Sequence, residues 1–246
     1  MIRVDLDYIY AKNKIFFGLE SKLGSLNELM TAKLDSLFKL AEKYDIKILV
    51  HPFITSPPMW QSWPLNPYSI EQGGPAKDPY DFMLSKDAQN AFGNRLEEIS
   101  KRWGRSKAFF GWDLMNEANI LVANDDYYSL KNWILKIGNR IAEFENKLYG
   151  EAHPRMVSWS EVIPSSVNYY FLYNSPALNV AATHPYDIYG SALSVDSPFS
   201  SRISTVNPAL KMNTKLNGII PALKDKRPYM ENERHQTNSV PLTFYK

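Results

Sequence analysis

The stretch FFGWDLMNE, residues 109–117, contains the transition on which the fold and the site both depend. Its first part, Phe109–Met115, is almost entirely apolar and predicts a buried strand. A polar pair, Asn116 and Glu117, follows directly. Where several such strands run parallel, their carboxyl ends meet at one edge, and polar residues placed there can share a site. Glu117 is therefore the first candidate for chemistry.

Five further segments predict strands on either side of this one: Ile2–Tyr8, Ile46–Val50, Met156–Glu161, Asn179–Thr183 and Pro228–Glu231. Helical patterns separate them. Apolar residues recur at helical spacing over residues 26–41, Ser85 and Asp87 open a second helix, an amphipathic helix covers Tyr127–Tyr149, and a less regular stretch lies near 207–223. Strands that alternate with helices in this way imply βαβ units and a parallel sheet.

The fold class predicted from this alternation is α/β, as a TIM (β/α)8 barrel. No Gly-rich phosphate loop follows the first strand, so a doubly wound nucleotide fold is disfavoured. About six strands are visible, and a complete barrel takes about 250 residues or more. With a long loop at roughly 54–84, the 246 residues predict one catalytic domain, 1–246, that is part of a longer barrel and incomplete at both ends.

Composition excludes several classes of protein. The 28 basic residues are scattered among 26 acidic ones, so no nucleic-acid surface is expected. No run approaches the roughly 20 apolar residues of a membrane span, and the N-terminus lacks the pattern of a signal peptide. The absence of cysteine excludes a thiolate site and leaves the compartment open. A polymeric substrate would favour an extracellular location.

Polar and ionisable residues gather where the predicted strands end. In chain order they are Arg3 and Asp5, His51, Asn116 and Glu117, Glu161, His184 and Tyr186, and Glu231 and Glu233. A barrel selected only for stability would not need this distribution. Simpler readings exist, because Glu117 could sit in an ordinary turn and Arg3 could merely pair with Asp5 or Asp7.

The order Arg, His, Asn-Glu, His-x-Tyr, Glu on successive strand ends resembles the clan of retaining barrel glycosidases that includes glycoside hydrolase family 5, the cellulases and β-mannanases. The resemblance extends from Arg3 to Glu233. It implies that Glu117 is the acid/base and that Asn116 hydrogen-bonds the sugar 2-hydroxyl. It further implies that His184 and Tyr186 surround the two carboxylates, and that Arg3 keeps the nucleophile ionised. Members of the family usually have a tryptophan at the end of the eighth strand, and no such strand follows here.

The nucleophile has two candidates, Glu231 and Glu233, which would share one face of a strand. Family members commonly show Lys-Pro or Arg-Pro, then four residues, then the nucleophile Glu. Counting from Arg227 and Pro228 favours Glu233, which is also nearer the carboxyl end of the strand. Retention requires two carboxyl groups about 5–5.5 Å apart, one protonated and one ionised.

The predicted function is a retaining hydrolase that cleaves a β-linked glucan or mannan, with β-1,4 linkage expected, by double displacement and without cofactor or metal. His51 and Trp60 are expected to contact the oligo- or polysaccharide substrate, although Trp60 could equally pack its loop onto the barrel. Two alternatives remain open. One is an exo-β-glycosidase of the same clan, and the other is a catalytically incomplete carbohydrate-binding barrel. An incomplete barrel would also favour a homo-oligomer that covers its edges.

Overall fold

A computed structural model describes residues 1–10, 15–53, 62–121, 126–158, 177–183 and 229–231. Its centre is a four-stranded parallel sheet. The strands are, in spatial order, β1 (Ile2–Asp5), β6 (Ile48–His51), β7 (Phe109–Asp113) and β8 (Arg155–Met156). Each strand neighbours the next parallel strand along the chain. A barrel requires this order, whereas a doubly wound sheet reverses direction at a switch point.

Two further strands, β9 (Ala181–Thr183) and β10 (Tyr229–Glu231), pair with one another in parallel. The chain leading into β9 lies against β8, because the backbone N–H groups of Asn179 and Val180 both donate to the carbonyl oxygen of Arg155. The succession of sequential parallel neighbours therefore continues past the four-stranded sheet.

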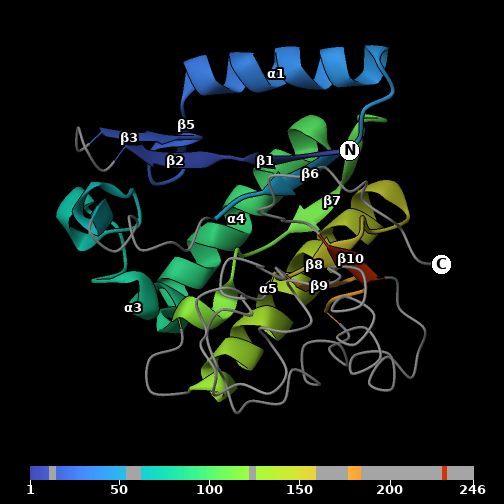
Figure 1. Ribbon diagram of the computed structural model, residues 1–246. Coiled ribbons are helices and arrows are strands. Elements are labelled where there is room, and N and C mark those ends of the chain that lie inside the picture. The colour runs from blue at the N-terminus through green and yellow to red at the C-terminus, as the bar shows by residue number, and fades with distance from the viewer. Residues whose placement is uncertain (11–14, 54–61, 122–125, 159–176, 184–228, 232–246) are drawn as a thin grey trace, which may run out of the picture.

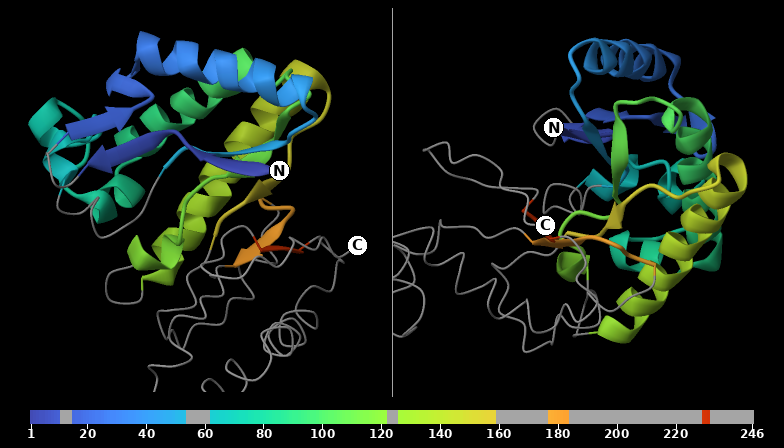
Figure 2. Two further views of the ribbon diagram at one scale, coloured as in Figure 1. Left: turned by 45° about the horizontal axis from the view of Figure 1, so that its top comes forward. Right: turned by 90° about the vertical axis from the view of Figure 1, so that its right-hand side faces the viewer.

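Helices cover one face of the sheet. They are α1 (Glu28–Lys43), α4 (Lys86–Trp103) and α5 (Tyr127–Tyr149), with the short α3 (Pro79–Leu84) preceding α4. The right view of Figure 2 shows α1, α4 and α5 around the outer side of the parallel strands. The side chain of Ser85 accepts a hydrogen bond from the backbone of Ala88 and caps α4, as the sequence predicts. An αL glycine, Gly150, ends α5.

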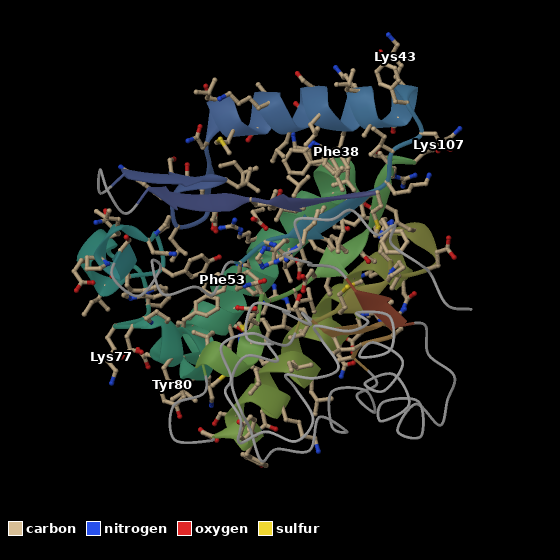
Figure 3. All side chains as sticks on the ribbon, viewed as in Figure 1. Phe38, Lys43, Phe53, Lys77, Tyr80 and Lys107 are labelled. Atoms are coloured by element: carbon tan, nitrogen blue, oxygen red, sulfur yellow. The ribbon has the colours of Figure 1, made fainter. Side chains whose placement is uncertain are left out.

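The main core lies between these helices and the sheet. Phe38 reaches from α1 toward the sheet (Figure 3) and stacks on Phe109 of β7, with 6.0 Å between ring centroids. Phe53, just after β6, stacks on Phe82 of α3 at 4.1 Å. A smaller apolar cluster on the opposite face of the sheet contains Leu49 and Met156. Both faces of the sheet are thus buried, as expected for parallel strands.

Strand β7 carries an extra residue. Ile48 pairs with Phe109 but the next residue, Leu49, pairs with Gly111, so Phe110 is inserted as a bulge. The rings of Phe109 and Trp112 consequently lie on the same side of the sheet, with centroids 4.9 Å apart. The bulge shifts the alternation by one residue, so that Asp113 points to the face of the sheet away from the helices.

One prediction about the N-terminal region is wrong. The expected strand Ile2–Tyr8 is interrupted at Leu6, whose backbone N–H donates to the carbonyl oxygen of His51. After it, β2 (Asp7–Tyr10) and β3 (Ile15–Gly18) form an antiparallel hairpin, and β4 (Glu20–Lys22) pairs with β5 (Ser25–Leu26). Figure 1 shows this extension beside β1, below the end of α1. Neither hairpin is predicted from the sequence.

The predicted fold class, α/β with a parallel sheet, is confirmed. The strands expected at Ile46–Val50, Phe109–Met115, Asn179–Thr183 and Pro228–Glu231 correspond to β6, β7, β9 and β10, and that at Met156–Glu161 corresponds to the shorter β8. The described part of the loop at 54–84 contains two 3-10 helices, Trp63–Leu65 and Ile70–Gln72, before α3. The helix expected near 207–223 lies outside the described residues.

Candidate active site

Three of the predicted site residues meet at the carboxyl end of the sheet. Nη2 of Arg3 donates to Oδ1 of Asn116 across 2.7 Å and lies 3.1 Å from Nδ1 of His51. These residues come from β1, from the segment after β7 and from the end of β6. The parallel pairing of β1 with β6 sets Asp5 beside His51 and so aligns the ends of the two strands. Residues distant in sequence therefore form one cluster.

The imidazole of His51 is oriented by Asp5. Its Nδ1 lies 2.6 Å from Oδ1 of Asp5, so Nδ1 carries the proton and donates to the carboxylate. Because Arg3 can only donate, its 3.1 Å approach to the same nitrogen is a contact rather than a second hydrogen bond. The opposite ring nitrogen, Nε2, is buried and has no partner among the residues that the structure describes.

Asp113 and Ser158 form the floor of this cluster. Asp113 is fully buried, and its Oδ1 accepts a hydrogen bond from the backbone N–H of Ser158 across 3.1 Å. Its Oδ2 accepts from the hydroxyl of Ser158 and lies 3.3 Å from Nε of Arg3. One carboxylate thereby connects β7, β8 and β1. Sequence analysis assigned no role to Asp113 or Ser158, although a charged residue inside the apolar run 109–115 is a signal that could have drawn attention to Asp113.

Glu117 follows Asn116 in a strained conformation. It has a φ of 41°, in the left-handed region that non-glycine residues adopt uncommonly, and its side chain is buried. Hydrogen bonds on both sides hold this geometry: Asn116 N–H donates to the carbonyl oxygen of Phe53, and Ala118 N–H donates to that of Ser158. Strain of about 1–3 kcal/mol persists where the surroundings over-determine the backbone, commonly at functional sites.

The remaining predicted residues cannot be placed in this cluster. Trp60, Glu161, His184, Tyr186 and Glu233 lie outside the described residues, and of Glu231 only its position as the last residue of β10 is described. The structure brings Arg3, His51 and Asn116 together, and Glu117 follows Asn116 in the chain. The part of the predicted site concerning His184, Tyr186 and either nucleophile candidate stays a prediction.

A separate ionic cluster lies beneath the N-terminal hairpin. Arg95 of α4 is fully buried and binds Asp7 at 2.8 Å and Glu20 at 3.0 Å. Burial by itself lowers the pKa of Arg95, but the charges of Asp7 and Glu20 outweigh it, so the net shift is upward. The phenol of Tyr68 is also buried, and burial, reinforced by the charge of Glu20, raises its pKa well above the ordinary range. This cluster fixes the hairpin and the described end of the long loop to α4.

At the opposite end of the sheet, Glu145 of α5 is fully buried and accepts from the indole of Trp112, the hydroxyl of Ser100 and the backbone N–H of His153. Burial raises the pKa of Glu145, but the interactions with His153 and Ser100 prevail and lower it overall. A nearby cavity of about 600 Å³ is lined by residues that precede β7 and β8, among them Arg105 and His153. It therefore lies away from the carboxyl-end cluster, and its residues carry none of the predicted roles.

Within the described ranges no group of His, Cys, Asp and Glu is arranged to hold a metal ion. Among the helices described, none is both long and apolar enough to cross a membrane.

A parallel α/β sheet with Arg, His and Asn-Glu at its carboxyl edge resembles the glycoside hydrolase family 5-like barrel enzymes, and comparison with known proteins confirms this distant resemblance. No family model matches the chain. It is 25% identical over 138 residues to mannan endo-1,4-β-mannosidase F of Aspergillus clavatus, covering 54% of this chain and 30% of that protein. It is 28% identical over 116 residues to the probable mannan endo-1,4-β-mannosidase A-2 of Aspergillus terreus, covering 47% and 27%.

The matched region thus spans less than a third of each curated relative. Among solved structures, the exo-β-1,4-mannosidase of an Opitutaceae bacterium has a TM-score of 0.48 and 12% identity, over 84% of this chain and 42% of that one. The Pseudomonas stutzeri endoglucanase has a TM-score of 0.44 and 15% identity, over 76% and 49%.

Proposed function

We propose that this chain is the catalytic part of a retaining glycoside hydrolase that cleaves β-1,4-linked mannan, with Glu117 as acid/base and Glu233 as nucleophile. In the first step Glu233 attacks the anomeric carbon while Glu117 donates its proton to the departing glycosidic oxygen. In the second step Glu117 accepts a proton from water, whose oxygen attacks the same carbon and releases Glu233. No cofactor enters this sequence.

The observation that carries the proposal is the geometry of Asn116 and Glu117. Both follow a buried parallel strand. Asn116 accepts from Arg3 and donates to the carbonyl oxygen of Phe53 after β6, and Ala118, next to Glu117, donates to that of Ser158 after β8. The left-handed backbone of Glu117 is the kind of local strain that a functional constraint explains, since an ordinary turn at this position would favour glycine or asparagine. Precise placement matters because proton transfer requires hydrogen-bond reach to the leaving oxygen.

The contact from Arg3 also supports this proposal, because it orients the Asn116 amide. A guanidinium has only donors, so Oδ1 of Asn116 must face it, as the 2.7 Å contact indicates. The Nδ2 donor end then points away from Arg3. A donor in this position suits a sugar 2-hydroxyl, whose hydrogen bond strengthens in the transition state of glycoside cleavage.

The choice of substrate depends on the curated relatives, both of which are described as mannan endo-1,4-β-mannosidases. A β-1,4-mannan is therefore the first polymer to assay, and β-1,4-glucan is the second. An aryl β-mannoside would reveal exo action, because an endo enzyme needs sugars bound on both sides of the cleaved bond.

The test of the acid/base is Glu117→Gln, assayed on mannan and on an aryl mannoside with a strongly acidic leaving group. General acid catalysis contributes about 10²–10⁴-fold, so turnover of mannan should fall by that factor while the formation of the glycosyl-enzyme from the activated substrate is nearly unchanged. Glu151→Gln, at an exposed carboxyl, is the matched control and should leave both rates unchanged. Equal losses on the two substrates would contradict the assignment, and a wild-type chain inactive on all of them would contradict the proposed function.

A further inference from the structure

The cluster contains a buried carboxylate that the proposed chemistry does not use, Asp113. Every contact described for its oxygens comes from a donor: the backbone N–H and the hydroxyl of Ser158, and Nε of Arg3 at 3.3 Å. A carboxylate accepts at both oxygens, whereas an amide of the same shape has one acceptor and one donor end. Asparagine at this position would therefore turn an NH2 group toward either Ser158 or Arg3.

Asp113 forms an ion pair with the same guanidinium that binds Asn116. Nε of Arg3 faces Asp113, and Nη2 donates to Oδ1 of Asn116 at 2.7 Å. The contact at Nε is an ion pair, and because the guanidinium is planar and rigid, its position relative to Asp113 limits the directions in which Nη2 can point. The competing anion is Asp5, whose Oδ1 lies 3.9 Å from the same Nε and whose side chain is 45% exposed. The fully buried Asp113 is the better anchor, since it is itself fixed by Ser158.

We propose that Asp113 is a positioning residue for the contact to the sugar 2-hydroxyl, acting through Arg3 on the amide of Asn116. The inference rests on the proposed function for the identity of the ligand. The chain Ser158–Asp113–Arg3–Asn116 fixes the amide with its oxygen toward Arg3 and its nitrogen toward the substrate. Loss of the charge at Asp113 frees Arg3 to swing toward Asp5 and allows the amide to turn.

The experiment compares Asp113→Asn with wild type on an aryl mannoside and its 2-deoxy analogue. Wild type should prefer the substrate with a 2-hydroxyl. In Asp113→Asn the preference should fall about tenfold, the size of one well-oriented hydrogen bond, with the loss mainly in kcat. In an Asn116→Ala background, Asp113→Asn should reduce the preference no further, because the two residues act through one contact.

Glu145→Gln is the matched control. Glu145 is also a fully buried carboxylate, and it accepts hydrogen bonds from the hydroxyl of Ser100 and the indole of Trp112. It lies, however, on the helix-covered face of the sheet. Its replacement should cost stability and leave the 2-hydroxyl preference at the wild-type value. A loss of preference in both variants would indicate general loosening, and a wild-type preference in Asp113→Asn would overturn the inference while leaving the proposed function intact.

A second measurement does not depend on turnover. In NMR spectra of the full chain, the side-chain amide signals of Asn116 and the Hε signal of Arg3 should shift or broaden in Asp113→Asn but not in Glu145→Gln. Unchanged Asn116 amide signals in Asp113→Asn would overturn the positioning role, whether or not the chain hydrolyses a glycoside. Shifted signals in a chain that is inactive on every mannoside would support the positioning role and contradict the proposed function.

Discussion

Replacing Arg95 with methionine should be among the most destabilising single changes in the described part of the chain. The guanidinium is fully buried and neutralises two carboxylates, Asp7 and Glu20, whose side chains are only 7% and 3% exposed. Methionine fills a similar volume, so cavity formation contributes little. Among the described residues, the carboxylates would keep hydrogen bonds from the backbone N–H groups of Leu19 and Gly24, and Glu20 would keep its interaction with the phenol of Tyr68. Removing one partner of a buried pair costs about 3–5 kcal/mol, and two charges are left here. The total free energy of unfolding of a typical domain is only about 5–15 kcal/mol.

The control is Arg102→Met on the same helix. Arg102 forms a bidentate pair with Asp35 at 3.0 and 2.7 Å, but its side chain is 44% exposed, and exposed pairs contribute about 0–1 kcal/mol. Urea unfolding followed by tryptophan fluorescence and circular dichroism measures both variants, with equal m-values as the condition for comparison. A combined variant with Arg95→Met, Asp7→Asn and Glu20→Gln should recover much of the loss. The reasoning is refuted if Arg95→Met and Arg102→Met differ by less than about 1 kcal/mol.

Two further predictions concern pH and the nucleophile. The pKa of Glu145 is lowered from its ordinary 4.5, so its ionised form contributes stability that is present above that value and lost as the pH falls through the lower folded pKa. Urea unfolding at pH 7 and at successively lower pH should show the stability gap between wild type and Glu145→Gln shrinking in acid, and a constant gap would contradict this. Trapping with a 2-fluoro mannoside and peptide mapping should place the label on Glu233. A label on Glu231 would transfer the role, and an active enzyme without label on either would exclude the retaining mechanism.

Elements with strong local signals could be predicted from the sequence. The apolar runs at β6 and β7, the periodic face of α5 and the serine cap of α4 depend on neighbours within a few residues. The break at Leu6 could not be predicted, because Asp7 after it binds residues that are distant in sequence, among them Arg95 of α4. The run Ile2–Tyr8 has the composition of one continuous strand, and only the tertiary contacts divide it.

The candidate site shows the same division between local and long-range information. Strand order and the polar residues at strand ends suffice to bring Arg3, His51 and Asn116 together, since parallel neighbours align their carboxyl ends. The orientation of the Asn116 amide and the imidazole of His51 does not follow from strand order. The Asn116 orientation depends on Arg3, which can only donate, and the His51 orientation depends on Asp5, which can only accept. These partners are known only once the strand register is known.

The direction of Asp113 is the clearest case. Phe109 faces the helices, so regular alternation along β7 would turn Gly111 and Asp113 to the helices as well and Trp112 toward Arg3. The bulge at Phe110 reverses this. Trp112 instead reaches Glu145, and Asp113 reaches Arg3. At Gly111 a Cβ would lie 2.4 Å from the carbonyl oxygen of Pro154, so the close approach of the chain entering β8 requires glycine beside the inserted residue. The bulge at Phe110 and the close approach of Pro154 to Gly111 therefore decide which face of β7 carries Asp113, and so whether Asp113 can form an ion pair with Arg3.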